Sequence, residues 1–142
     1  MNLPIPQLPT PVLINPEGLY DPAPNGYSHV GLAPIGTRLV FIAGQGGEDA
    51  AGALADGFRA QVRQALDNLR TAARSVGGDL GSVVKQTVLI VDHSEARLHV
   101  LGEEFERAYG PGPKPTCTLI PVPRLALDGM LFEVEAVVAV NG

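Results

Sequence analysis

The sequence lacks tryptophan and has one cysteine, Cys117, so no disulfide can form within the chain. Basic residues are also few, with 10 Lys and Arg against 15 Asp and Glu, for a net charge of −5. Nucleic acids and anionic membrane surfaces require a basic surface, so we expect neither as a partner. No apolar run approaches a membrane span. The proline-broken N-terminus has no basic segment of the kind found in signal peptides. We therefore expect a soluble, cytoplasmic protein.

Motifs for several common catalytic sites are missing as well. His29, His93 and His99 have no metal-ligand spacing, and neither HExxH nor CxxC occurs, so we expect no metal. The glycine-rich segment that begins at Gly44 matches no phosphate-binding motif, and two acidic residues soon follow it. This excludes nucleotide binding. Without a GxSxG motif, a serine hydrolase has no support either.

The chain has 142 residues, of which 45% are apolar, and this size suits one domain with its own core. Seven of the 13 prolines precede residue 25. Because proline blocks helix and donates no backbone hydrogen bond, residues 1–25 are predicted to form an extended arm. The arm either lies over the domain or a neighbour, or is a mobile tail. Residues 26–142 are predicted to form the domain.

Apolar periodicity predicts two helices and five strands. A hairpin of residues 28–33 and 37–43 is followed by a helix, capped by Asp56, whose apolar stripe runs from 58 to 76. A buried strand at 82–91 precedes a second helix, capped by Ser94 and ended by Gly110. Strands at 116–122 and 130–140 close the chain. Pro121 and Pro123 prevent a ladder on one side of the first of these. The order β-β-α-β-α-β-β predicts an α+β fold, a mixed sheet with two helices on one face.

Three polar positions in these strands are candidates for chemistry. Glu133 and Glu135 alternate within an otherwise apolar strand, so both carboxylates lie on one face. That face is either solvated or, because the flanking residues are so apolar, lines a pocket or an interface. Cys117 is either a small buried residue or a reactive thiol, and the latter would need a cationic neighbour.

Several segments together resemble the YjgF/RidA family, also called endoribonuclease L-PSP-like or reactive-intermediate deaminase. They are Gly26-Tyr27-Ser28-His29, similar to GPYSQ, and residues 39–45, LVFIAGQ, similar to IxISGQ. In the helices and later strands they are residues 61–69, QVRQALDNL, residues 84–88, VKQTV, Pro123-Arg124 and residues 133–136, EVEA. The resemblance covers residues 27–140, and the order and spacing of these segments make it specific.

The resemblance implies a chorismate mutase-like, YjgF-type fold. It also implies a homotrimer whose sheets form a central barrel, with a small-molecule cleft at each subunit interface. Typical members hydrolyse imines and enamines of amino acids without metal or organic cofactor. By the same resemblance, Glu133 is the catalytic residue that orients water. The substrate-binding positions are Tyr27, Ala43, Gly44, Gln45, Cys117 and Thr118.

The departures from the family pattern shift the expected substrate. Cys117 stands where the family has the arginine that clamps a substrate carboxylate, Ala43 replaces a serine, and Gly102 replaces an asparagine. An unpaired buried carboxylate is costly, so 2-imino acids are poor candidates. We expect a hydrolase for a small imine, enamine or related C–N or carbonyl compound that no carboxylate anchors. The alternative is a non-catalytic metabolite-binding or regulatory trimer. A ribonuclease, the family's older label, is the weakest of the three readings.

Overall fold

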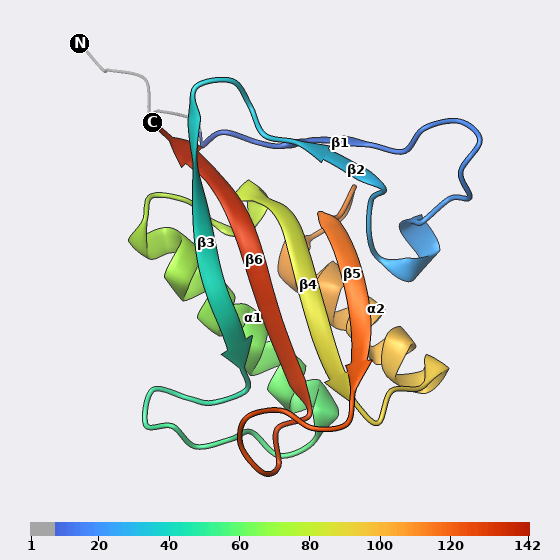
Figure 1. Ribbon diagram of the computed structural model, residues 1–142, viewed down its shortest axis with the longest axis vertical. Coiled ribbons are helices and arrows are strands. Elements are labelled where there is room, and N and C mark those ends of the chain that lie inside the picture. The colour runs from blue at the N-terminus through green and yellow to red at the C-terminus, as the bar shows by residue number, and fades with distance from the viewer. Residues whose placement is uncertain (1–7) are drawn as a thin grey trace.

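A four-stranded mixed sheet backed by two helices makes up most of the computed structural model, which describes residues 8–142 (Figure 1). Across the sheet the strands run in the order β3 (Thr37–Gly46), β6 (Phe132–Asn141), β4 (Val83–Val91) and β5 (Thr116–Val122). The helices α1 (Phe58–Ser75) and α2 (Glu95–Tyr109) cover one face, and the short 3-10 helix η2 (Leu80–Ser82) precedes β4. The predicted α+β class, with both helices on the same face, is confirmed.

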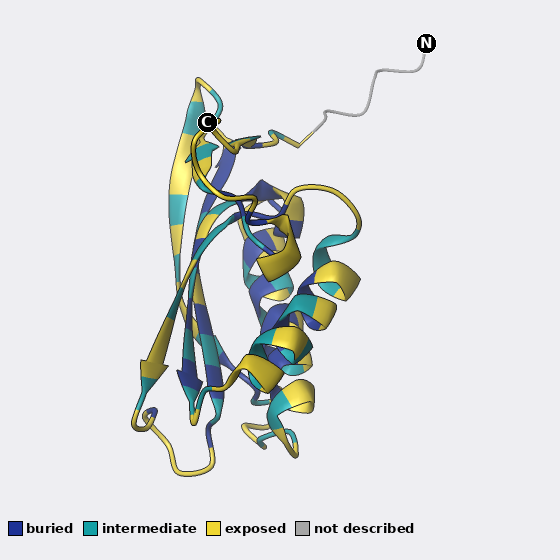
Figure 2. Cartoon of the chain, turned by 90° about the vertical axis from the view of Figure 1, so that its right-hand side faces the viewer, coloured by how far each residue is buried: buried dark blue, intermediate teal, exposed yellow. Residues whose placement is uncertain are grey.

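The core lies between this sheet and α1, as the buried colouring of the facing surfaces shows in Figure 2. Strand β6 alternates because successive side chains point to opposite faces, so Phe132, Val134 and Val138 are fully buried toward the helices. The helix meets them with its apolar stripe of Val62, Ala65, Leu66, Leu69 and Ala73. Alternate side chains of β6 therefore pack against the apolar stripe of α1. The side chains between them lie on the open face of the sheet, which is turned away from the core.

The connections and helix caps of the domain agree with the predicted elements except at the start of α1. The parallel pair β4 and β5 is joined through α2, and β5 is an edge strand, in keeping with the prolines at its end. Ser94 caps α2 as predicted, since its side chain accepts a hydrogen bond from the Arg97 backbone N–H at 3.2 Å. At α1 the prediction was wrong. The N-cap is Gly57, at φ 90°, and no side chain caps this end, so Asp56 lies one residue too early.

The predicted hairpin is also wrong. Strand β2 (Val30–Leu32) pairs antiparallel with β1 (Val12–Ile14) from the proline-rich segment, and β3 pairs with β6. The chain does turn between β2 and β3, but Gly31 packs across the main sheet, where an added Cβ would lie 3.0 Å from the Val84 carbonyl oxygen. The 3-10 helix η1 (Ala23–Asn25) completes the connection from β1 to β2. Residues 1–7 of the predicted arm lie outside the described residues.

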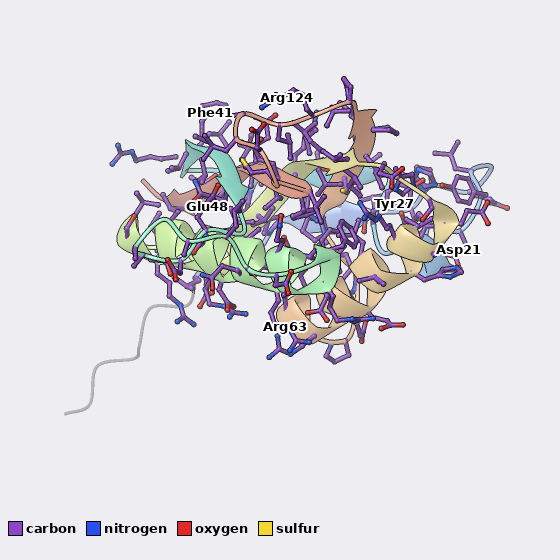
Figure 3. All side chains as sticks on the ribbon, turned by 90° about the horizontal axis from the view of Figure 1, so that it is seen from below. Asp21, Tyr27, Phe41, Glu48, Arg63 and Arg124 are labelled. Carbon is purple, nitrogen blue, oxygen red and sulfur yellow. The ribbon has the colours of Figure 1, made fainter. Side chains whose placement is uncertain are left out.

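The face of the sheet turned away from the helices carries exposed apolar side chains. Phe41 is 77% exposed, and Leu39 and Ile120 are about half exposed on the same side. In Figure 3, Phe41 projects from the side of the sheet opposite Arg63 of α1. Among residues 8–142, no helix is both long and apolar enough to cross a membrane.

A buried carboxylate joins the two helices. Glu104 of α2 is 3% exposed, and its oxygens accept from Arg63 Nε at 2.7 Å and from Arg59 Nη1 at 3.1 Å on α1. These contacts lower the pKa of Glu104, the hydrogen bond from Arg63 having the largest effect. The neighbouring Glu103 is exposed, and its one ion pair within residues 8–142 is with Arg59.

We predict that Glu104→Gln lowers the melting temperature by a few degrees at pH 7, because it removes the charge of the buried carboxylate that pairs with Arg59 and Arg63. The difference should narrow as the pH falls through the lowered pKa, since the wild-type carboxylate then loses its charge as well. Thermal melts between pH 7 and pH 3 measure this. The matched control, Glu103→Gln, should change little. Equal melting temperatures for Glu104→Gln and wild type at pH 7 would contradict the prediction.

Candidate functional site

A cavity of about 730 Å³ lies beside the edge strand β5, between that strand, helix α2 and residues 25–29, and we call it the edge cavity. Apolar side chains of α2 and β5 form one wall. The lining residues are Asn25, Tyr27, Ser28, His29, Lys85, His93, Leu98, Leu101, Phe105, Thr116, Cys117, Thr118 and Leu119. Its volume is in the range of small-molecule sites, and a mostly apolar lining with a few polar groups is typical of them.

Tyr27 is held at this cavity by the turn before it, by a hydrogen bond of the residue after it and by its own hydroxyl. Gly26 adopts a left-handed conformation at φ 78°, which turns the chain at the end of η1. The next residue, Ser28, is buried, and its hydroxyl donates to the Lys114 carbonyl oxygen at 2.6 Å. The Tyr27 hydroxyl itself bonds to that of Tyr20. This bond and partial burial raise the pKa of Tyr27 to about 12, so the phenol is neutral at physiological pH.

Cys117 lies on the wall of the same cavity and packs against the core. Burial raises the pKa of its thiol to about 12. The nearest cation in the sequence, Lys114, is occupied elsewhere, because its ammonium lies 2.7 Å from Glu106 and 2.8 Å from the Gly112 carbonyl oxygen. Burial without a cationic partner favours the interpretation of Cys117 as an unreactive thiol.

The predicted catalytic carboxylate, Glu133, lies on the interior strand β6, two strands away from the edge strand β5. A bulge between Ile42 and Gln45 distorts the pairing of β3 with β6, and Glu133 folds over Gly44 at this point. An added Cβ at Gly44 would lie 2.0 Å from the Glu133 Oε1 atom, so only glycine permits this approach. Burial, followed by the charges of Glu48 and Glu135, raises the pKa of Glu133. This carboxyl group therefore holds its proton to a higher pH than an ordinary glutamate.

The other residues predicted at this end lie around the same bulge. Ala43 and Gly44 are exposed, and the Gln45 side-chain amide donates to the Ala43 carbonyl oxygen at 3.0 Å. Glu48 covers Gly46, where an added Cβ would meet its Oε2 atom at 2.7 Å. We call Ala43, Gly44, Gln45, Glu48 and Glu133 the carboxylate region. No group of three or more His, Cys, Asp or Glu residues arranged to hold a metal occurs within residues 8–142.

Within one chain the edge cavity and the carboxylate region are separate. Glu133 pairs with Leu89, which pairs with Ile120 of β5, so two strand spacings, roughly 10 Å, separate β6 from β5. Figure 3 shows Glu48 and Tyr27 toward opposite ends of the molecule. Of the predicted site residues, Tyr27, Cys117 and Thr118 line the cavity. Ala43, Gly44, Gln45 and Glu133 lie together in the other region.

The comparisons with known proteins agree with this fold. The family model described as endoribonuclease L-PSP matches residues 20–140. The chain belongs to this family, the YjgF/RidA family. A Rid family protein of unknown function from Yersinia pestis is 32% identical, with a TM-score of 0.86 over 92% of this chain and 99% of that one. RidA from an Antarctic Psychrobacter is 26% identical, with a TM-score of 0.66 over 82% and 95% of the two chains. No curated protein sequence matches the chain.

Some residues of this YjgF/RidA chain were not predicted as site residues and yet line the edge cavity or contact its lining. Tyr20 bonds to Tyr27 from the proline-rich segment, where sequence periodicity carries no signal. His93 was weighed only as a metal ligand, although it lines the cavity directly after β4. The cavity wall contains no arginine and no carboxylate among the residues described, and Lys85 is its one permanently charged lining residue.

We predict that Cys117 reacts slowly with iodoacetamide. At pH 8 a thiol with a pKa of about 12 is almost entirely protonated, whereas an unfolded cysteine with a pKa of about 8.5 is partly thiolate. Alkylation of the folded chain should be at least about a hundredfold slower than in denaturant and should accelerate with rising pH. Mass spectrometry of quenched samples measures both rates, and similar rates in the two states would contradict the raised pKa.

Proposed function

We propose that this YjgF/RidA protein hydrolyses a small imine, enamine or related C–N or carbonyl compound that carries no anchoring carboxylate. The observation that carries the proposal is the placement of Glu133, a half-buried carboxyl group with a raised pKa, directly over the exposed Gly44 backbone. A carboxyl group whose pKa is raised toward neutral pH is suited to accept and return protons, and perturbed carboxyl groups gather at functional sites.

In the proposed reaction water is the nucleophile. Glu133 accepts a proton from water while the oxygen forms a bond to the imine carbon, and the C=N electron pair moves to nitrogen. Glu133 then returns the proton to the nitrogen of the carbinolamine. Collapse of that intermediate breaks the C–N bond as its hydroxyl proton passes through Glu133 to the departing nitrogen. It releases ammonia and leaves a carbonyl product. The Gly44 backbone and the Thr118 hydroxyl would hold the substrate, and Cys117 would line the floor.

The exclusion of carboxylate-bearing substrates follows from the edge cavity. Family resemblance aligns Cys117 with the substrate-clamping arginine, and a neutral thiol cannot offset a ligand's negative charge. A buried carboxylate without a cationic partner is strongly unfavourable. Lys85 lines the cavity opposite Thr116 in the strand register, but it is exposed to solvent and so is not a buried partner for a carboxylate. Arg124 is engaged with Asp128 at 2.9 Å, away from the lining residues.

We further propose a homotrimer in which a neighbouring copy completes each site. Two features support it: one chain keeps the edge cavity and the carboxylate region apart, and the open face of the sheet exposes Phe41, Leu39 and Ile120. Exposed apolar patches of this kind mark interaction surfaces. Burial of that face between copies would form the central barrel that the family resemblance implies.

The alternative is a trimer that binds a metabolite without converting it. The apolar wall of the edge cavity and its protonated Cys117 thiol favour this candidate, because binding a molecule there requires no reactive side chain. RNA cleavage has little support, since the net charge is −5.

The central test is ammonia release from imines generated in situ. An amine oxidase acting on benzylamine supplies an uncharged imine, and an amino acid oxidase acting on alanine supplies a 2-imino acid. We expect the protein to accelerate hydrolysis of the uncharged imine alone. Glu133→Gln should reduce this acceleration at least about a hundredfold, the usual contribution of an acid–base group. The matched control is Glu135→Gln, an exposed carboxylate two residues away on the same face, which should retain most activity.

Two results would reject this proposal. Undiminished turnover by a correctly assembled Glu133→Gln protein would remove the catalytic role of Glu133. Binding that raises the melting temperature without release of product would favour the metabolite-binding alternative.

For the assembly, we predict that Phe41→Lys converts the trimer to smaller species, because it would bury a charge in the proposed interface. Sedimentation velocity measures the change. Ile35→Lys is the matched control, since Ile35 is a fully exposed apolar residue in the turn before β3. Identical sedimentation of wild type and Phe41→Lys would place the interface elsewhere.

A further inference from the structure

We propose that Asn68 of α1 is a positioning residue for the carboxylate region: its side-chain amide fixes the segment after β3 and so holds the Glu48 carboxylate beside Glu133. Asn68 acts through Glu48, because the bonds that it donates end on the backbone that carries this carboxylate. The inference rests on the proposed function only for its effect on turnover. Its direct consequence is for the protonation of Glu133, which can be measured without a substrate.

The Asn68 side chain joins α1 to the segment that leaves β3. Its Nδ2 atom donates to the Gly46 carbonyl oxygen at 3.0 Å and to the Glu48 carbonyl oxygen at 2.8 Å. Both carbonyl oxygens can only accept, so the nitrogen of the amide must face them and both of its hydrogens are used. The amide oxygen accepts from Gln64 Nε2, one helical turn earlier, at 3.0 Å. These three bonds fix the amide and, with it, the backbone that it binds.

Two glycines let this segment lie close to both the helix and the sheet. At Gly47, an added Cβ would lie 2.6 Å from the Gln61 Cα atom, so the segment packs directly on the backbone of α1. At Gly46, the Glu48 carboxylate occupies the space that a side chain would fill. Gly46 is paired with Glu133 across β3 and β6. Because directly paired residues of antiparallel strands share a face, the Glu48 carboxylate takes the side-chain position opposite Glu133.

A second amide of α1 holds the segment that carries Glu133. Gln61 is 3% exposed, and its Oε1 atom accepts from the Leu131 backbone N–H at 2.8 Å. Leu131 directly precedes β6, so this bond fixes the chain two residues before Glu133. The two carboxylates are therefore held by different side chains of one helix. Loss of the Asn68 donors should release Glu48 and leave Glu133 in place.

The charges near Glu133 are carboxylates from two elements. Glu48 comes from the loop after β3, and Glu135 lies two residues away on β6. Residues 39–46 of β3 carry no charge. Strand β4 has one charged residue, Lys85, which is four positions along from the residue paired with Glu133. Burial is the largest cause of the raised pKa of Glu133, and the charge of Glu48 is the next, ahead of that of Glu135.

The test is an NMR titration of ¹³C-labelled glutamate carboxyl groups in the full chain, with Glu133→Gln identifying the Glu133 signal. We expect Glu48→Gln to lower the pKa of Glu133, because it removes a neighbouring negative charge. Asn68→Ala should lower it in the same direction and by no more than Glu48→Gln does, because the released carboxylate moves toward solvent. An unchanged pKa in Glu48→Gln, or in a folded Asn68→Ala protein, would overturn the inference.

The matched control for Asn68 is Gln64→Ala. This change removes an amide one turn earlier on the same helix and leaves both Asn68 donors in place. It should therefore change the pKa of Glu133 less than Asn68→Ala does. An equal or larger effect of Gln64→Ala would show that the bonds to the Gly46 and Glu48 carbonyl oxygens are not the cause.

Double variants separate positioning from a general loosening of the structure. In the Glu48→Gln background, Asn68→Ala should have no further effect on the pKa of Glu133, because the charge through which Asn68 acts is gone. In the Glu135→Gln background, Asn68→Ala should still lower this pKa. Equal effects of Asn68→Ala with and without the Glu48 charge would reject the positioning role. Should Asn68→Ala not fold, Asn68→Ser replaces it in the same cycle, and Glu48→Gln alone can still overturn the inference.

Turnover gives a separate result. As a proton acceptor Glu133 must be ionised, so kcat/KM for the uncharged imine should rise with pH through its pKa. Asn68→Ala should move this rise to lower pH. The expected pKa changes without imine hydrolysis would retain this inference and reject the proposed function. Hydrolysis that requires Glu133, in a protein whose Glu133 pKa does not respond to Glu48 or Asn68, would do the reverse.

Discussion

The burial of one face of β6 against α1 is the constraint on which the rest of the structure depends. Because this strand lies between β3 and β4, its side chains have only two directions: into the core or onto the open face. Val134, Ala136 and Val138 fill the core, so the intervening residues must face away from the helices. A shift of one residue would bury Glu133 and Glu135 in the core, at a cost that excludes the alternative register.

The same constraint produces two chemically different regions. On the open face, carboxylates of β6 and the loop after β3 approach one another around a glycine bulge, and burial together with their mutual repulsion favours protonation of Glu133. At the other end, the cavity beside β5 is lined by hydroxyl, thiol and imidazole groups and by Lys85, against an apolar wall. In the proposed reaction, the first region transfers protons and the second binds the substrate. An active site that uses both needs them brought together between copies of the chain.

Sequence patterns predicted the elements that pack on the core and missed those that do not. The stripe of α1, the Ser94 cap of α2 and the strand containing Glu133 all follow from periodicity, because burial of one face imposes it. The partner of β2 could not be predicted this way, since three residues between prolines have no measurable period. The same limit applies to Tyr20, which bonds to Tyr27 seven residues away through a loop. The bulge at Gly44 likewise depends on a partner strand about ninety residues later in the chain.

The prolines of the N-terminal segment lower the conformational entropy that this segment loses when it orders beside the cavity. Pro16, Pro22 and Pro24 lie in the connection between β1 and β2 that carries Tyr20. Each proline fixes its own φ angle and so removes conformations from the unordered segment. Less entropy is therefore lost when the segment settles against Tyr27 and His29. The segment that bonds to Tyr27 in the cavity lining is therefore largely pre-organised, which reduces the ordering cost that binding at this cavity would carry.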